Sequence, residues 1–212
     1  MVATRVPTIS AGLDKLPQGN PALWRGRDGD NSTADIKTGF AALDAALPGG
    51  GWPAGALTEI LCEPHASGAL RLLMPALARV HGDGRCQAWI APPFVPYAPA
   101  LAAVGIDLAA TILIYKPQAA DALWSAEQLL RSGLCNAVLL WPKTADFRAL
   151  RRLQLAAEQG DCRGVVFRGV ACAAQPSPAA LRLRLCALGD EIEVQILKAR
   201  GGLNRQNVRL KL

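Results

Sequence analysis

Histidine and cysteine are the side chains of this chain that could supply nucleophilic or metal chemistry, and their spacing supports neither. Only two histidines and six cysteines occur among 212 residues. Cys62 and His65 have the C-x2-H spacing of metal ligands, but no second ligand pair accompanies them. The cysteines lie in or beside apolar runs without a CxxC pair, as free thiols of a reducing compartment do. No Gly-x-Ser-x-Gly elbow is present. We expect no catalytic residue, metal or cofactor, and therefore no enzyme.

Cations near the C-terminus are the second group of side chains that could bind a ligand or a partner. Residues 196–212 contain no acid and supply five of the six net positive charges, from Lys198, Arg200, Arg205, Arg209 and Lys211. Such a tail can contact nucleic-acid phosphates or an acidic partner, or it can decorate a solvated edge strand. The edge strand is the commoner case, so we expect at most a weak contact with DNA.

The composition indicates the class of protein and its cellular compartment. The 51% share of hydrophobic residues is enough for one buried core. No apolar run reaches 18 residues, and the first twenty residues lack the apolar region of a secretory signal. We expect a cytoplasmic protein without a membrane segment.

Residues 1–35 are rich in proline and glycine and predict an extended arm, on which Leu23 and Trp24 are candidate docking residues.

From residue 36 onward, strand and helix patterns alternate. Apolar runs predict strands at 57–61, 86–91, 111–115, 136–141 and 164–168, and helical stripes fall at 68–81, 98–104, around 123–130 and at 145–159. The run 136–141 is nearly continuously apolar, which is typical of a parallel strand covered on both faces. Residues 181–187 and 192–197 flank Gly189-Asp190 and predict a hairpin, and 208–212 predict another strand. The fold class is therefore α/β, with a mainly parallel sheet and an antiparallel C-terminal hairpin in one domain, 36–212.

One stretch of this domain resembles the opening of the RecA core. It reads Thr38-Gly39-Phe40-Ala41-Ala42-Leu43-Asp44, then Gly49-Gly50-Gly51-Trp52-Pro53-Ala54-Gly55, then Leu57-Thr58-Glu59-Ile60. In RecA such a segment leads into the phosphate loop, G-x-x-x-x-G-K-[ST]. The resemblance covers about 38–212 and implies a RecA-like core.

At the place of the phosphate loop the functional groups are missing. The sequence there is Glu63-Pro64-His65-Ala66-Ser67-Gly68-Ala69-Leu70. Ala69 stands where the lysine would meet the phosphates, and Leu70 stands where a hydroxyl would hold Mg²⁺. A Glu63 carboxylate roughly 5 Å from phosphate would repel it by about 3 kcal/mol at an effective dielectric of about 20. The resemblance also implies an acid after the second strand, where Pro92-Pro93 follow, and an Asp at Trp141. We expect this degenerate loop not to bind ATP.

Among RecA relatives that have lost the ATP site, the pattern is most similar to ImuA, an adaptor of bacterial mutagenesis cassettes. The segment Leu23-Trp24-Arg25-Gly26 favours ImuA over the related SulA-type division inhibitors. The resemblance implies a non-catalytic adaptor in the SOS response and translesion synthesis, with an ImuB-type polymerase-like protein and RecA as partners. A SulA-type inhibitor of FtsZ and a degenerate ATPase are the alternatives. Association of the chain with itself also stays open.

The resemblance gives the cations near the C-terminus a specific role. Lys198 and Arg200 stand where RecA carries two cations into the ATP site of the neighbouring protomer. This chain could therefore lend them to RecA and cap a filament, because a cation at a γ-phosphate stabilises its charge. The alternative is a solvated basic strand. Arg205 and Arg209 complete the candidate interaction residues.

Overall fold

One eight-stranded sheet organises the protein. The computed structural model describes residues 35–212 except 64–66, 81–83, 116–117 and 202–205. The strand order is β3-β2-β4-β5-β1-β6-β7-β8. The six strands from β3 to β6 run parallel, and β7 and β8 continue the sheet antiparallel. The bounds are Leu57–Cys62 (β1), Cys86–Ile90 (β2), Thr111–Ile114 (β3), Cys135–Leu140 (β4), Arg163–Gly169 (β5), Leu181–Leu188 (β6), Glu191–Ala199 (β7) and Asn207–Lys211 (β8).

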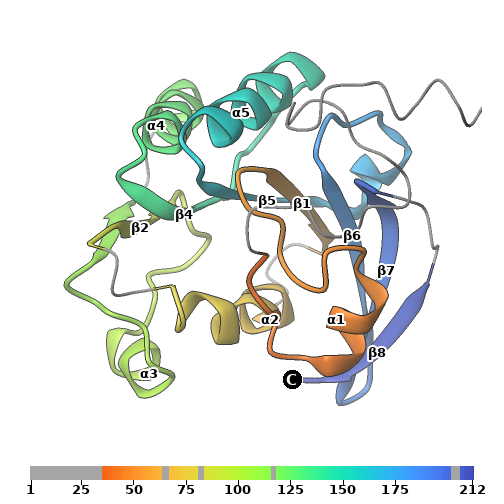
Figure 1. Ribbon diagram of the computed structural model, residues 1–212. Helices are drawn as coiled ribbons and strands as arrows, with labels where there is room; N and C mark the ends of the chain where they lie inside the picture. The colour runs from red at the N-terminus through yellow and green to blue at the C-terminus, as the bar shows by residue number, and fades with distance from the viewer. Residues whose placement is uncertain (1–34, 64–66, 81–83, 116–117, 202–205) are drawn as a thin grey trace, which may run out of the picture.

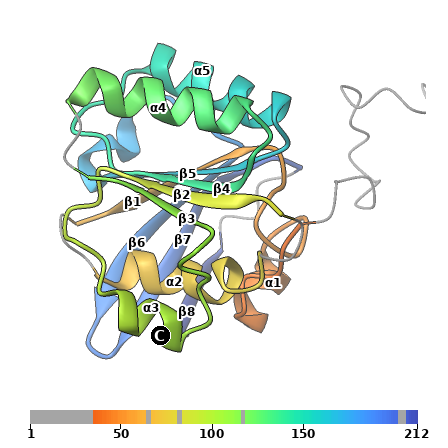
Figure 2. The same cartoon turned by 90° about the vertical axis from the view of Figure 1, so that its left-hand side faces the viewer.

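Helices cover both faces of the sheet (Figures 1 and 2). One face carries α4 and α5, and the other carries α1, α2 and α3. The helices span Ala41–Ala46 (α1), Ser67–Leu77 (α2), Ala98–Ala103 (α3), Ala119–Arg131 (α4) and Phe147–Gln159 (α5), and a short 3₁₀ helix, η2, spans Val170–Ala174. This layering confirms the α/β class, the mainly parallel sheet and the antiparallel C-terminal hairpin.

Two apolar cores follow from the layers. The larger lies under α1, α2 and α3 and includes Trp89, Leu139 and Phe167 from the parallel strands. Inward residues of β6, β7 and β8 join it because the C-terminal strands bend around α1 and α2 (Figure 1). The smaller core joins α4 and α5 to the opposite face of the sheet. Strands β1 and β4 are buried at every residue, as expected for central parallel strands covered on both faces.

Two helices differ from the sequence prediction. Helix α2 ends at Leu77, four residues before the predicted end, and contains Pro75, which has no N–H for the helical ladder. The chain continues in tighter turns, in which Arg79 N–H donates to Ala76 O. Helix α1 was not predicted, because six residues are too few to show the apolar periodicity of a helix. The carboxylate of Asp44 fixes its start by accepting from Thr38 N–H at 2.8 Å.

The glycines between α1 and β1 serve two purposes. Gly50 and Gly55 have φ of +67° and +52°, as expected for turns that favour glycine. Gly51 is required by close approach, since a Cβ there would lie 2.3 Å from the carbonyl oxygen of Ile36. Ile36 pairs at this point with the buried Trp52 in an isolated antiparallel bridge.

The part of the chain that the structure describes contains no helix long and apolar enough to cross a bilayer. The arm predicted at 1–35, with Leu23 and Trp24, lies outside the described residues apart from residue 35.

Replacement of Gly160 by alanine should destabilise the packing of α4 against α5. A Cβ at Gly160 would lie 2.0 Å from the carbonyl oxygen of Leu130, so the ends of both helices must shift. We expect Gly160→Ala to lower the free energy of unfolding by about 1–3 kcal/mol in urea titrations. Gly169→Ala is the matched control, because a Cβ there meets nothing within 4 Å. Equal stabilities of the two variants would contradict this packing.

Candidate functional site

The first turn of α2 lies where a phosphate loop would deliver its cation, and it is packed into the core. Ala69 is 3% exposed, and Leu70 packs against the same apolar cluster. A Cβ on Gly68 would lie 3.3 Å from Leu212 and 3.4 Å from Ile192, so the helix start rests on the C-terminal strands. Glu63 follows β1 and is exposed, whereas Pro64 and His65 lie outside the described residues. The described positions of this loop therefore carry one anion, Glu63, and one hydroxyl, Ser67 at the first position of α2, but no cation.

Aromatic rings occupy the neighbouring strand ends. Trp141 directly follows β4, at the position where the resemblance implies a metal-binding Asp. Its ring stacks on Phe167 of β5 at 4.3 Å between centroids and 7° between planes. Trp89 of β2 lies 6.4 Å from Trp141 in a tilted arrangement. These rings hold the strand ends together by apolar contact and offer no oxygen ligand to a cation.

The end of β2 shows a local backbone strain. Ala91 has φ of +53°, a left-handed conformation that an alanine rarely adopts. Its N–H donates to Ile114 O at 2.8 Å, which holds the end of β2 against β3. The chain then enters Pro92-Pro93, so the side chain at this corner is a methyl group rather than an acid.

A buried carboxylate lies deeper in the same sheet, and sequence reasoning missed it. Glu59 in the middle of β1 is 0% exposed and is bound by two arginines from the flanking strands. Arg168 of β5 donates through Nη1 to one carboxylate oxygen at 2.5 Å, and Arg182 of β6 donates through Nε to the other. Both arginine side chains are themselves almost fully buried. A buried carboxylate is stable in such a place only when it is paired and hydrogen-bonded.

The cations around Glu59 also fix the segment 170–178, which includes η2. Arg182 Nη2 donates to Cys172 O at 3.0 Å, and Arg168 Nη2 donates to Gln175 Oε1 at 2.8 Å. Lys198 of β7, which is opposite Arg182 in the ladder, donates to Ser177 O at 3.0 Å. Three cations from three strands therefore hold one segment against the sheet. We call Glu59, Arg168, Arg182 and Lys198 the Glu59 cluster.

The Glu59 cluster has more positive than negative charge. It contains three cationic side chains and one carboxylate. Burial lowers the pKa of the Lys198 ammonium, and the nearby charge of Arg182 lowers it further, while Glu59 acts in the opposite direction. The charged form of Lys198 is therefore less favourable here than in a lysine that is fully in water.

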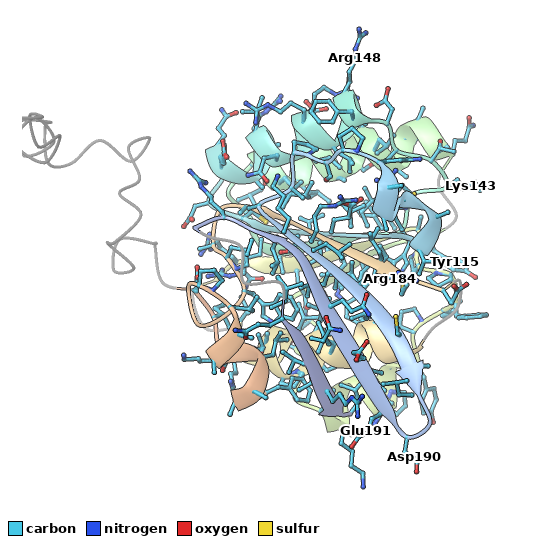
Figure 3. The ribbon with its side chains drawn as sticks, turned by 90° about the vertical axis from the view of Figure 1, so that its right-hand side faces the viewer. Tyr115, Lys143, Arg148, Arg184, Asp190 and Glu191 are labelled. Carbon is cyan, nitrogen blue, oxygen red and sulfur yellow. The ribbon has the colours of Figure 1, made fainter. Side chains whose placement is uncertain are left out.

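The structure separates the other candidate interaction residues. Arg200 follows β7, is largely exposed, and lies 3.9 Å from Glu158 at the end of α5. Arg209 lies on the outer face of β8, 3.9 Å from Glu193. Figure 3 looks onto this outer face, with Arg184 on β6 and with Asp190 and Glu191 at the hairpin turn. Leu23, Trp24 and Arg205 lie outside the described residues. Among the predicted cations whose positions the structure describes, Lys198 alone joins the Glu59 cluster.

A simple signal in the sequence could have revealed the Glu59 cluster. Glu59, Arg168 and Arg182 each interrupt an apolar strand pattern, in Leu-Thr-Glu-Ile-Leu, Val-Val-Phe-Arg and Leu-Arg-Leu. An ionisable residue inside a buried strand needs a partner, so one acid and two bases in such places predict a pairing. The described residues contain no group of three His, Cys, Asp or Glu side chains that could hold a metal ion. Cys62 ends β1 as a buried thiol.

Removal of the Glu59 charge should lower the free energy of unfolding far more than removal of a carboxylate whose two arginine partners are exposed. Glu59→Gln leaves two buried arginines without a counter-charge, and we expect a loss of about 3–5 kcal/mol in the free energy of unfolding. Glu127 also lies between two arginines, Arg131 at 2.7 Å and Arg152 at 3.4 Å, but both are well exposed.

Glu127→Gln should therefore cost less than about 1 kcal/mol. Urea unfolding followed by circular dichroism measures both variants. A loss for Glu59→Gln no larger than that for Glu127→Gln would refute the structural role assigned to the cluster.

Two groups of known proteins are similar to this chain, although no family model matches it. RecA from Lactobacillus acidophilus is 29% identical over 156 residues, which is 72% of this chain and 42% of that protein. RecA from Rubrobacter xylanophilus is 32% identical over 138 residues, or 64% of this chain and 39% of that protein. The chain thus spans about two fifths of the RecA proteins it matches.

The second group is the cell division inhibitor SulA. The crystal structure of SulA from Pseudomonas aeruginosa aligns with a TM-score of 0.45 and 26% identity, covering 52% of this chain and 96% of the other. SulA from Edwardsiella piscicida is 35% identical over 116 residues, which is 52% of this chain and 68% of that protein. With this identity over two thirds of the SulA sequence, and with its additional similarity to RecA, the chain belongs to the SulA-like family of RecA-related proteins.

Proposed function

We propose that this protein is a non-catalytic adaptor in the bacterial SOS response that binds an ImuB-type polymerase-like protein and RecA during translesion synthesis. The observation that carries the proposal is the packed start of α2. The positions that would need a lysine and a hydroxyl for ATP are Ala69 and Leu70, and both contact the apolar core. Similarity to RecA and to the cell division inhibitor SulA supports a role in the response to DNA damage.

The packing around this site supports a role in binding rather than in nucleotide hydrolysis. A lysine at 69 would place an ammonium group in a position that is 3% exposed and surrounded by apolar side chains, which is costly without a paired anion. The stacked Trp141 and Phe167 fill the neighbouring strand ends. The proposed loss of the ATP site thus involves several contacts. One substitution would therefore not restore nucleotide binding. A degenerate ATPase is the alternative that this packing disfavours.

The C-terminal strands offer the surface on which RecA would bind. Arg200 is 61% exposed in its side chain and has only a long contact with Glu158, so it can reach a partner with little rearrangement. Lys198 already donates to Ser177 O, and to leave this contact it must give up one hydrogen bond. We therefore assign Arg200 the larger share of any contact made in trans to a RecA-bound phosphate, and Lys198 a smaller one.

A SulA-type role is the second candidate, and a specific observation favours it. The 35% identity to SulA extends over 68% of that protein, whereas similarity to RecA extends over a smaller share. In this case the partner would be the division GTPase FtsZ. The two roles differ in their partner and not in their fold, so a binding experiment separates them.

Arg200→Ala should weaken binding to RecA filaments more than Lys198→Ala does. The experiment measures binding of the full chain to purified RecA on single-stranded DNA with a non-hydrolysable ATP analogue, to the ImuB-type protein and to FtsZ. Loss of one charge-assisted contact, worth about 1.5–3 kcal/mol, corresponds to an affinity about tenfold to a hundredfold lower.

Arg148→Ala is the matched control, because Arg148 is an exposed cation that projects from the α5 layer, away from the C-terminal strands (Figure 3). Its RecA binding should be unchanged. Binding to FtsZ, with none to RecA or the polymerase-like protein, would replace the adaptor role with the SulA-type role. Unchanged RecA binding by a double variant at 198 and 200 would remove these cations from the interface.

A further inference from the structure

Three of the six free cysteines gather at one end of the sheet. Cys86 is the first residue of β2, Cys135 is the first residue of β4, and Cys162 directly precedes β5. These strands are neighbours in the sheet, in the order β2-β4-β5 (Figure 1). All three side chains belong to the apolar core under α4 and α5 or pack against it. The topology thus brings together thiols that are distant in the sequence.

Two of these thiols are in direct contact. The Sγ atoms of Cys86 and Cys135 lie 3.1 Å apart, and the two residues are opposite one another in the parallel ladder of β2 and β4. Adjacent strands are separated by about 4.8 Å, which falls within the range of about 4.4–6.8 Å between the Cα atoms of a disulfide. A bond between these sulfurs therefore requires little movement of either strand.

The two thiols differ in their access to solvent. Cys135 is 0% exposed, whereas Cys86 is half-buried at the rim of the core. The Cys86 thiol donates at 3.3 Å to the carbonyl oxygen of Leu134, a residue with a well-exposed side chain. Burial raises the pKa of the Cys135 thiol, and the contact with Cys86 raises it further. A reagent in solution therefore reaches and attacks Cys86 first.

We propose that Cys86 and Cys135 are a redox-active pair that a low-molecular-weight disulfide of the glutathione type converts into an intramolecular disulfide. The Cys86 sulfur, after loss of its proton, attacks one sulfur of the reagent, and the other half of the reagent leaves as a thiol with that proton. The Cys135 sulfur then attacks the Cys86 sulfur, and the second half of the reagent leaves with the Cys135 proton. Two protein thiols are oxidised, and one reagent disulfide is reduced to two thiols.

Oxidation of this pair fastens the outer part of the sheet. The chain between the two cysteines contains the rest of β2 together with α3, β3 and α4. In the described part of the chain, β3 pairs with β2 alone, and β2 is joined to the remaining strands through β4. A covalent link from β2 to β4 restricts the opening of this whole unit, because it closes a long loop in the unfolded chain. The redox state of the pair therefore sets the local stability of the unit.

Cys162 is the alternative partner for Cys135, and the geometry disfavours it. Cys162 is 0% exposed, and its Sγ contacts the carbonyl oxygen of Arg163 at 3.9 Å. Burial raises the pKa of this thiol to about 12. The ladder of β4 and β5 begins after both cysteines, so it does not place Cys135 and Cys162 opposite each other. The bond that forms first should therefore join Cys86 to Cys135.

Incubation of the full, folded chain in glutathione buffers of increasing disulfide content tests the proposal. After the remaining thiols are trapped with N-ethylmaleimide, mass spectrometry should show that two thiols have been lost, and a peptide map should join the peptides of Cys86 and Cys135. Hydrogen exchange of amides in β2 and β3 should slow at least about tenfold in the oxidised chain. A reducing thiol should reverse both changes.

Cys86→Ser should abolish the intramolecular bond, while its hydroxyl can still donate to the Leu134 carbonyl. Cys135→Ala should stop the reaction at the first step and leave glutathione attached to Cys86. The matched control is the double variant Cys172→Ser with Cys186→Ser, because both cysteines are half-buried like Cys86 but lie outside the group of three. This control should oxidise as the native chain does. Circular dichroism checks that each variant keeps the fold.

Two results would overturn the proposal. In the first, Cys86 and Cys135 of the native chain stay reduced at the highest disulfide content, or Cys86 keeps a bound glutathione that Cys135 never displaces. In the second, the peptide map joins other cysteines, either Cys135 with Cys162 or Cys172 with Cys186, while Cys86→Ser leaves the yield of disulfide unchanged.

Discussion

The pairing of Glu59 with Arg168 and Arg182 is the constraint on which the structure depends. It joins three adjacent strands, β5, β1 and β6, at a point that water does not reach. Buried ion pairs of this kind add little net stability compared with apolar residues, but the loss of one partner leaves the others uncompensated. The cluster therefore specifies which strands are neighbours and keeps the segment 170–178 on the sheet through Cys172, Gln175 and Ser177.

Strand β1 connects this cluster to the degenerate loop. Its middle carries the buried charge, and its end leads into a helix start that is packed on Ile192 and Leu212 of the C-terminal strands. In a nucleotide-binding protein the corresponding space is kept polar and open for phosphate. Here the aliphatic contacts of α2 and the aromatic stack of Trp141 on Phe167 occupy it. The strand scaffold is thus retained, and the proposed adaptor role would depend on the surface of the molecule, including Arg200 after β7 and the outer face of β6 to β8.

The sequence predicted the parts of this fold that depend on local pattern. The nearly continuous apolar run at 136–141 predicted the buried parallel strand β4, and Gly189-Asp190 predicted the hairpin between β6 and β7. It did not predict the Glu59 cluster, because the arginines lie 109 and 123 residues away and only the strand order brings them together. The exposed edge at β3 was also hidden, since Thr111–Ile114 has the same apolar pattern as a buried strand. Position in the sheet, rather than composition, decides between these two cases.

The central claim is that packing has replaced the phosphate site, and equilibrium titration of the full chain with ATP and Mg²⁺ tests it most directly. The account predicts no saturable heat of binding at the millimolar concentrations of ATP found in cells. A saturable heat of ATP binding would contradict the account, provided that it is lost when Gly68 at the start of α2 is replaced by a bulky residue.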